Sequence, residues 1–216
     1  MTAYNPIPGN ADVTAGERHW DTLYRSKAPT AVSWYQESPA LSLAMIERSR
    51  IDRKARIVDV GGGASTLVDR LLEKGFATVS VLDIAPAALA AAKARLGEQA
   101  HRVEWIVADV TAWHPQQPYD LWHDRAVFHF LVHATDRRNY VAALQAALAP
   151  GGHVVIATFA LDGPERCSGL PVVRYGPESL ASELGEDFRL IESVPETHVT
   201  PAGVEQRFIY CRFQRR

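Results

Sequence analysis

The chain has few cysteines, no long apolar run and no surplus of charge of either sign. Two cysteines among 216 residues, Cys167 and Cys211, are too few for a disulfide framework and lack the spacing of a zinc site. The 23 basic and 25 acidic residues nearly cancel, so the charge gives no indication of a nucleic-acid or anionic-membrane partner. No apolar stretch reaches the length that spans a bilayer, and the first residues lack the pattern of a signal peptide. We therefore expect a cytoplasmic protein with no nucleic-acid partner and no membrane partner.

Short runs rich in β-branched residues alternate with helical patterns through the middle of the chain. We expect strands at 56–60, 78–84, 103–110, 119–125 and 153–160, and helices between them at 65–75, 86–97 and 136–152. Such alternation is typical of βαβ units that build a parallel sheet covered on both faces.

The two ends of the chain depart from this alternation. Upstream, 13–27 and 38–50 have helical patterns, and the first dozen residues are expected to form a loose arm. Downstream, a segment rich in Gly and Pro (162–176) and a short helix from Pro177 precede two strand patterns, 188–199 and 205–213. The link between these strands is too short for a crossover helix, so they must pair antiparallel.

The stretch IVDVGGGAST (57–66) places three glycines between the first strand and the first helix. Glycine is favoured where φ is positive or where another group must approach the backbone closely. A tight turn without a ligand would also explain it. However, ligands of open α/β sheets bind at the carboxyl ends of the strands, which is where these glycines lie.

Acidic residues occur toward the ends of three successive strands, at Asp59, Asp83 and Asp109. Asp83 lies 22 residues past Gly61, where an acid can accept both ribose hydroxyls of an adenine nucleotide. A single acid of this kind is often only a helix cap, but three in register favour a nucleoside site. The dinucleotide pattern G-x-G-x-x-G is incomplete because Thr66 replaces its last glycine, and the P-loop pattern is absent.

These motifs together resemble those of the class I S-adenosylmethionine-dependent methyltransferases. VDVGGGAS resembles the first motif of that family, although Ser65 stands at its third glycine position. VLDIAPAALAAAKARL, VEWIVADV and YDLWHDRAVFHFL resemble the second to fourth motifs, and LAPGGHVVIATFA the segment around the fifth strand.

The resemblance implies a Rossmann-like α/β fold with a seven-stranded, mostly parallel sheet in the order 3-2-1-4-5-7-6 and strand 7 antiparallel. It implies S-adenosylmethionine as cofactor and S-adenosylhomocysteine as product. We expect one domain over 1–216, comprising an N-terminal arm, helices and lid (1–50), a cofactor core (56–160), and an acceptor loop with the terminal strands (161–216). The cofactor-binding residues would be Asp59, Gly61, Gly62 and Gly63 at the methionine end, and Asp83, Ile84, Asp109 and Val110 at the nucleoside end.

The fourth strand ends in WHDRAVFHFLVH, which would lie near the reacting sulfur. We predict His123, Asp124 and Arg125 as catalytic residues, and we expect no metal because no carboxylate completes a site around the histidines. The loops near this end of the sheet would line the acceptor pocket. The residues predicted to line it are His129, Cys167, Arg174, Tyr175, Trp34 and Tyr35.

The predicted function is methyl transfer from S-adenosylmethionine to a small-molecule acceptor. Three alternatives stay open on the sequence. One is a protein-lysine methyltransferase, because the fourth motif faintly resembles that of some such enzymes. The others are a nicotinamide-dependent reductase, disfavoured by Thr66 and the terminal hairpin, and a cofactor-binding module without catalysis.

Overall fold

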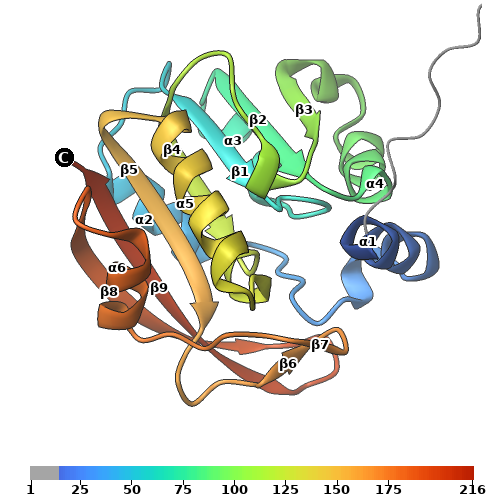
Figure 1. Ribbon diagram of the computed structural model, residues 1–216. Coiled ribbons are helices and arrows are strands. Elements are labelled where there is room, and N and C mark those ends of the chain that lie inside the picture. Colours follow the sequence, from blue (N-terminus) through green and yellow to red (C-terminus); the bar gives the residue numbers. More distant parts are fainter. Residues whose placement is uncertain (1–14) are drawn as a thin grey trace, which may run out of the picture.

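The computed structural model describes residues 15–216, so the predicted N-terminal arm lies outside the described residues. Seven strands form the main sheet. They are β1 (Arg56–Val60), β2 (Thr78–Asp83), β3 (Val103–Val107), β4 (Tyr119–Arg125), β5 (Leu148–Phe159), β8 (Phe188–Val199) and β9 (Glu205–Arg215). Their spatial order is β3-β2-β1-β4-β5-β9-β8 (Figure 1).

The first five strands pair in parallel, and β9 runs antiparallel to both of its neighbours, β5 and β8. When only the strands of this sheet are counted, the order is 3-2-1-4-5-7-6. The predicted α/β fold class and antiparallel seventh strand are therefore confirmed.

Six α-helices accompany the sheet in the described part of the chain. They are α1 (Ala15–Ser26), α2 (Ala40–Arg48), α3 (Leu67–Glu73), α4 (Pro86–Leu96), α5 (Ala134–Ala147) and α6 (Pro177–Leu184). Short 3-10 turns are η1 (Pro29–Ala31), η2 (Gly97–Arg102), η3 (Val110–Ala112) and η4 (Phe128–Phe130).

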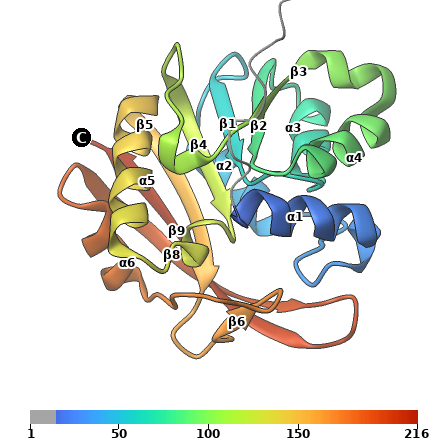
Figure 2. The same cartoon turned by 45° about the vertical axis from the view of Figure 1, so that its right-hand side comes forward.

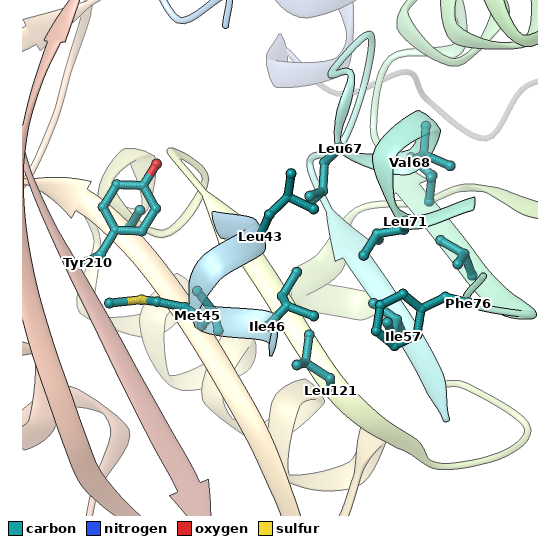
Figure 3. Close-up of a cluster of buried hydrophobic side chains, with 14 of the residues drawn as sticks. Leu43, Met45, Ile46, Ile57, Leu67, Val68, Leu71, Phe76, Leu121 and Tyr210 are labelled. Carbon is teal, nitrogen blue, oxygen red and sulfur yellow. The ribbon is translucent and has the colours of Figure 1, made fainter. Parts of the chain in front are cut away.

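The sheet has an apolar layer on each face because its strands are apolar on both sides. α2, α3 and α4 supply Leu43, Leu71 and Leu89 to one layer, and Figure 3 shows Leu43 of α2 beside Leu67 of α3. α5 and α6 supply Tyr140, Leu144, Leu180 and Leu184 to the opposite layer, where they pack on buried residues of β1, β4 and β5. Each buried large aliphatic or aromatic side chain stabilises the fold by about 1.5–3 kcal/mol.

The structure differs from the sequence prediction between 148 and 152. We predicted a helix to 152, but α5 ends at Ala147 and Leu148 already pairs with Tyr119. The pairing shifts register before Leu121, and Gly151 takes a positive φ of 76°. The Pro-Gly-Gly sequence therefore forms an irregular start of β5 rather than the end of a helix.

Two further details were not predicted. The 162–176 segment contains a small hairpin of β6 (Arg166–Cys167) and β7 (Leu170–Pro171). In addition, His129 and His133 do not lie on one helix, because His129 lies in η4 and His133 precedes α5.

The carboxyl ends of the parallel strands point toward one side of the molecule. Figure 2 shows α1 lying across this side, with the β6–β7 hairpin beyond it. No helix within residues 15–216 is long and apolar enough to cross a membrane.

Candidate active site

Two adjoining cavities lie at the carboxyl ends of β1, β2 and β4. The larger has a volume of about 400 Å³, within the range typical of small-molecule sites, and the smaller about 40 Å³. Both are bordered by Tyr24, Trp34, Gly61 and Arg125, so they are two parts of one site.

The glycines allow two carboxylates to approach the loop closely. A Cβ atom built on Gly62 would lie 2.5 Å from Asp59 Oδ2, and one built on Gly63 would lie 2.8 Å from Asp83 Oδ2. Gly61 and Gly63 also take positive φ angles of 64° and 44°. Any side chain at Gly62 or Gly63 would therefore displace an acid of the site. Gly61 borders both cavities, Gly62 only the smaller, and Gly63 neither.

Side chains outside the glycine run brace this loop. Thr66 donates its hydroxyl hydrogen bond to the carbonyl of Gln36 at 3.1 Å, which ties the loop to the 33–39 segment. Arg95 donates to the carbonyls of Ala64 and Ser65 at 2.7 and 2.6 Å. Thr66, which breaks the dinucleotide pattern, therefore anchors the segment that carries Trp34.

Asp83 lies at the wall of the larger cavity, almost fully buried. Burial raises the pKa of its carboxyl to about 7, and the charge of Asp59 adds to this rise. Hydrogen bonds from backbone N–H groups act in the opposite direction and lower the pKa. One of these bonds comes from Ala85 N at 2.8 Å to Oδ1. Asp83 is therefore poised between its neutral and charged forms near neutral pH.

The other predicted nucleoside residues border the same cavity. Ile84, Asp109 and Val110 all line it, together with Leu82 and Ala108. Asp109 accepts hydrogen bonds from Thr111 N at 2.8 Å and Thr111 Oγ1 at 2.7 Å, so it also caps η3. The structure thus brings to one cavity Asp83, which ends β2, and Asp109, which lies two residues past the end of β3.

His123 borders the smaller cavity and is nearly inaccessible, with 3% of its surface exposed. Its Nδ1 lies 2.7 Å from Asp59 Oδ1, and its Nε2 lies 2.9 Å from Ser42 Oγ. Both ring nitrogens are therefore engaged. The second carboxylate oxygen of Asp59, Oδ2, has no hydrogen-bond partner within residues 15–216.

Arg125 borders both cavities. It donates from Nε to the Tyr210 hydroxyl at 2.8 Å and from a terminal nitrogen to the carbonyl of Trp34 at 2.9 Å. Its guanidinium also lies over the Phe208 ring, 4.7 Å from the centroid, and 3.8 Å from a carboxylate oxygen of Glu196. Arg125 is thereby fixed in place and holds Trp34 at the site.

Asp124 lies outside both cavities, because residues alternate between the faces of β4. It accepts hydrogen bonds from Tyr140 at 2.7 Å and from the backbone of Val127 and Phe128 at 2.9 and 3.1 Å. Burial raises its pKa to about 6. The described contacts of Asp124 are thus with the turn after β4 and with Tyr140 of α5.

The predicted acceptor-lining residues divide into two groups. Trp34, Tyr35 and Cys167 border a cavity, Tyr35 only the smaller and Cys167 only the larger. His129, Arg174 and Tyr175 border neither.

The second group makes other contacts. His129 accepts a hydrogen bond from Phe159 N, and burial lowers its pKa to about 3. Tyr175 packs against Phe128, and Arg174 binds Glu165 and the carbonyl of Gly163.

Sequence reasoning did not assign Trp20, Tyr24 and Phe130 to the site, yet all three line the larger cavity. Trp20 packs edge-on against Phe130 and Trp34, with ring centroids 4.9 and 5.8 Å apart. Trp34 donates its indole hydrogen bond to the Tyr24 hydroxyl at 3.2 Å. The signal was present, because Trp20 and Tyr24 share one face of the predicted first helix.

The site suits a sulfonium nucleoside. Asp83 and Asp109 can accept hydrogen bonds from a ribose and a base, and aromatic rings stabilise a nearby cation. The unpaired oxygen of buried Asp59 fits an ammonium group. No cluster of three or more metal-ligand side chains occurs within residues 15–216.

A doubly wound sheet with a cavity of about 400 Å³ at its strand ends is typical of the Rossmann-like, nucleoside-binding class of proteins. Comparisons with known proteins narrow the class of protein further. A family model described as a methyltransferase domain matches residues 57–152. Nodulation protein S of Rhizobium fredii is 34% identical over 137 residues, which cover 63% of this chain and 74% of that protein. Nodulation protein S of a Sinorhizobium fredii strain is 32% identical over 158 residues, covering 73% and 69%.

Solved structures show the same fold. The N-methyltransferase NodS from Bradyrhizobium japonicum WM9, in complex with S-adenosyl-L-homocysteine, has a TM-score of 0.68 at 17% identity and covers 90% of this chain and 97% of its own. A Burkholderia thailandensis 1,6-didemethyltoxoflavin-N1-methyltransferase has a TM-score of 0.69 at 21% identity, covering 96% and 93%. The chain belongs to the class I S-adenosylmethionine-dependent methyltransferases. Its reaction is methyl transfer from S-adenosylmethionine, which sets aside the reductase alternative.

Proposed function

We propose that the enzyme methylates a small-molecule acceptor bound in the larger cavity. The observation that carries the proposal is the form of this cavity. It is covered by α1 and walled by Trp20, Trp34 and Phe130, with acids at its nucleoside end. A lysine side chain of a folded protein would need an open groove instead.

The curated relatives are consistent with this choice. They include a trans-aconitate 2-methyltransferase of Streptomyces avermitilis, 37% identical over 102 residues, which cover 45% of this chain and 36% of that protein. None of the seven curated proteins that match is described as a lysine methyltransferase.

We place the cofactor across the two cavities. The nucleoside would occupy the part of the larger cavity lined by Asp83, Asp109 and Val110, with its ribose on Asp83, and the acceptor the part lined by Trp20, Trp34 and Phe130. The amino-acid end would enter the smaller, where the free oxygen of Asp59 accepts a hydrogen bond from the ammonium. The sizes support this division, because about 40 Å³ holds only a few water molecules or one small polar group.

When bound, S-adenosylmethionine supplies a methyl group on a positively charged sulfur. The residues of this chain then have to align the acceptor with that methyl and exclude water. The aromatic residues Trp20, Trp34 and Phe130 close the cavity. Among residues 15–216, Arg125 is the one lysine or arginine that borders this cavity, and the charge of Arg125 is partly offset by Glu196.

His123 does not serve as a general base in this proposal. Its ring nitrogens are held by Asp59 and Ser42, and burial separates it from the larger cavity. An acceptor that carries a readily alkylated nitrogen or sulfur would need the least help with proton removal. We also propose a cytoplasmic location, supported by two cysteines that are buried and free.

The test is a search for the acceptor with a methyl-labelled donor. The enzyme is incubated with a metabolite extract and, separately, with a denatured and a native protein extract, and label is followed by mass spectrometry. We expect label in compounds below about 1 kDa, a size set by the pocket class. Label in lysine side chains alone would contradict the proposal.

A further inference from the structure

A hydrogen-bonded chain runs from the smaller cavity into the protein. Asp59 on β1 contacts His123 on β4, which contacts Ser42 on α2, at 2.7 and 2.9 Å. Nearby, the Tyr210 hydroxyl accepts a hydrogen bond from Arg125 at 2.8 Å. Three separate elements therefore meet at one imidazole, and all of Ser42, Asp59 and His123 are buried.

The chain fixes which nitrogen of His123 donates. A carboxylate oxygen accepts hydrogen bonds, so Nδ1 is the nitrogen that donates, toward Asp59 Oδ1. The Nε2 atom hydrogen-bonds the hydroxyl of Ser42. The two hydrogen bonds fix the orientation of the His123 ring. The fixed ring in turn fixes the orientation of the Asp59 carboxylate that it contacts.

As a result, one carboxylate oxygen of Asp59 has a hydrogen-bond partner and the other has none within residues 15–216. Oδ1 is taken by His123, whereas Oδ2 has no partner within residues 15–216 and lies against Gly62. Leaving a buried carboxylate oxygen without a donor is costly. A ligand that brings a donor to this oxygen recovers that cost, and an ammonium group brings one with the matching charge.

We infer that His123 and Ser42 form a positioning pair that holds Asp59 with its free oxygen available to the ammonium of the cofactor. This inference rests on the proposed placement of the amino-acid end in the smaller cavity. It replaces the catalytic role that the sequence suggested for His123. The pair recognises the ammonium through Asp59 and touches no reacting atom.

The test measures binding rather than turnover, by calorimetry with three ligands. S-Adenosylhomocysteine carries the ammonium, its desamino analogue lacks only that group, and 5′-methylthioadenosine lacks the whole amino-acid end. We expect the wild type to bind S-adenosylhomocysteine roughly ten- to hundredfold more tightly than the desamino analogue, as for a hydrogen bond to a charged group.

His123→Leu removes the donor to Asp59. We expect the preference for the ammonium to fall to about twofold or less, while the affinity for 5′-methylthioadenosine changes by less than about twofold. His123→Asn, which can still donate toward Asp59, should keep most of the preference. His198→Leu is the matched control, because His198 is also buried and hydrogen-bonded, to the carbonyl of Ser33, but borders neither cavity.

The outcomes separate the inference from the proposed function. Equal weakening of all three ligands in His123→Leu, or an unchanged preference, would overturn the positioning role. A wild type that fails to distinguish the desamino analogue would overturn it as well. A wild type that binds none of the ligands would instead contradict the cofactor placement. If His123→Leu does not fold, Ser42→Ala takes its place, with the same direction of change expected.

Discussion

The pKa of Asp83 makes cofactor binding depend on pH near neutrality. Its carboxyl is buried against the glycine loop, and its pKa is raised to about 7. A ribose hydroxyl donates more strongly to a carboxylate than to a neutral acid. If only the carboxylate form binds, the dissociation constant rises by the factor 1 + 10^(pKa − pH). S-Adenosylhomocysteine should then bind about elevenfold more weakly at pH 6, and about twofold more weakly at pH 7, than at high pH.

The matched variant is Asp83→Asn, which keeps the size of the side chain but does not titrate. Its affinity should be weaker than that of the wild type at pH 8 by about 1.5–3 kcal/mol, the range for hydrogen bonds to charged groups. The affinity should also stay nearly constant between pH 6 and pH 8. Calorimetric titrations in buffers of different ionisation enthalpy would report both the affinity and the proton released on binding. A flat wild-type profile, or an equal slope in the variant, would refute the reasoning.

The same pKa predicts the opposite effect on the stability of the ligand-free protein. The folded-state pKa lies above the ordinary value of about 4 for an unfolded aspartate, so the folded state binds more protons between these two values. The contribution of Asp83 to stability is therefore present below about pH 4 and lost as the pH rises through about 7. Asp83→Asn should melt at a higher temperature than the wild type at pH 8, and the difference should shrink toward pH 5. An equal or lower melting temperature at pH 8 would contradict the assignment.

Three other substitutions test the packing of the site. Gly62→Ala should abolish measurable cofactor binding and destabilise the fold by about 1–3 kcal/mol, because the new Cβ would lie 2.5 Å from Asp59 Oδ2. Gly203→Ala is the control, since Gly203 has a positive φ but open space around it. Equal calorimetric affinity of the two variants for the cofactor would refute the argument. Asp124→Ala should lower the free energy of unfolding in urea by about 3 kcal/mol or more, since three donors lose their acceptor. Asp124→Asn should keep turnover per folded molecule close to that of the wild type. A selective loss of turnover in this second variant would make Asp124 a catalytic residue. Trp20→Ala should weaken S-adenosylhomocysteine binding roughly two- to tenfold through lost ring contacts, and an unchanged fluorescence titration would remove α1 from the site.

Much of the architecture could be read from local patterns. The boundaries of β1 and β4 agree with the predicted runs, because an apolar stretch buried on both faces is bounded by polar or turn residues. The antiparallel ending followed from a link too short for a crossover. The start of β5 was missed, since the Pro-Gly-Gly sequence that ends many helices is used here inside an irregular strand.

The sequence by itself determined the class of ligand. The glycine loop, Asp83 and Asp109 have fixed positions along successive parallel strands, and the geometry of a parallel sheet brings such strand ends together. The sequence could not decide the roles of His123, Asp124 and Arg125 at the end of β4. Whether His123 and Asp124 face the site depends on the face of β4 that each occupies and on what packs there, and only the folded chain brings Ser42 and Tyr140 to them. His123 and Asp124, which the sequence predicted as catalytic, are buried and hydrogen-bonded to residues distant in sequence. The reason is that a polar side chain buried by tertiary packing needs a hydrogen-bond partner within the protein interior.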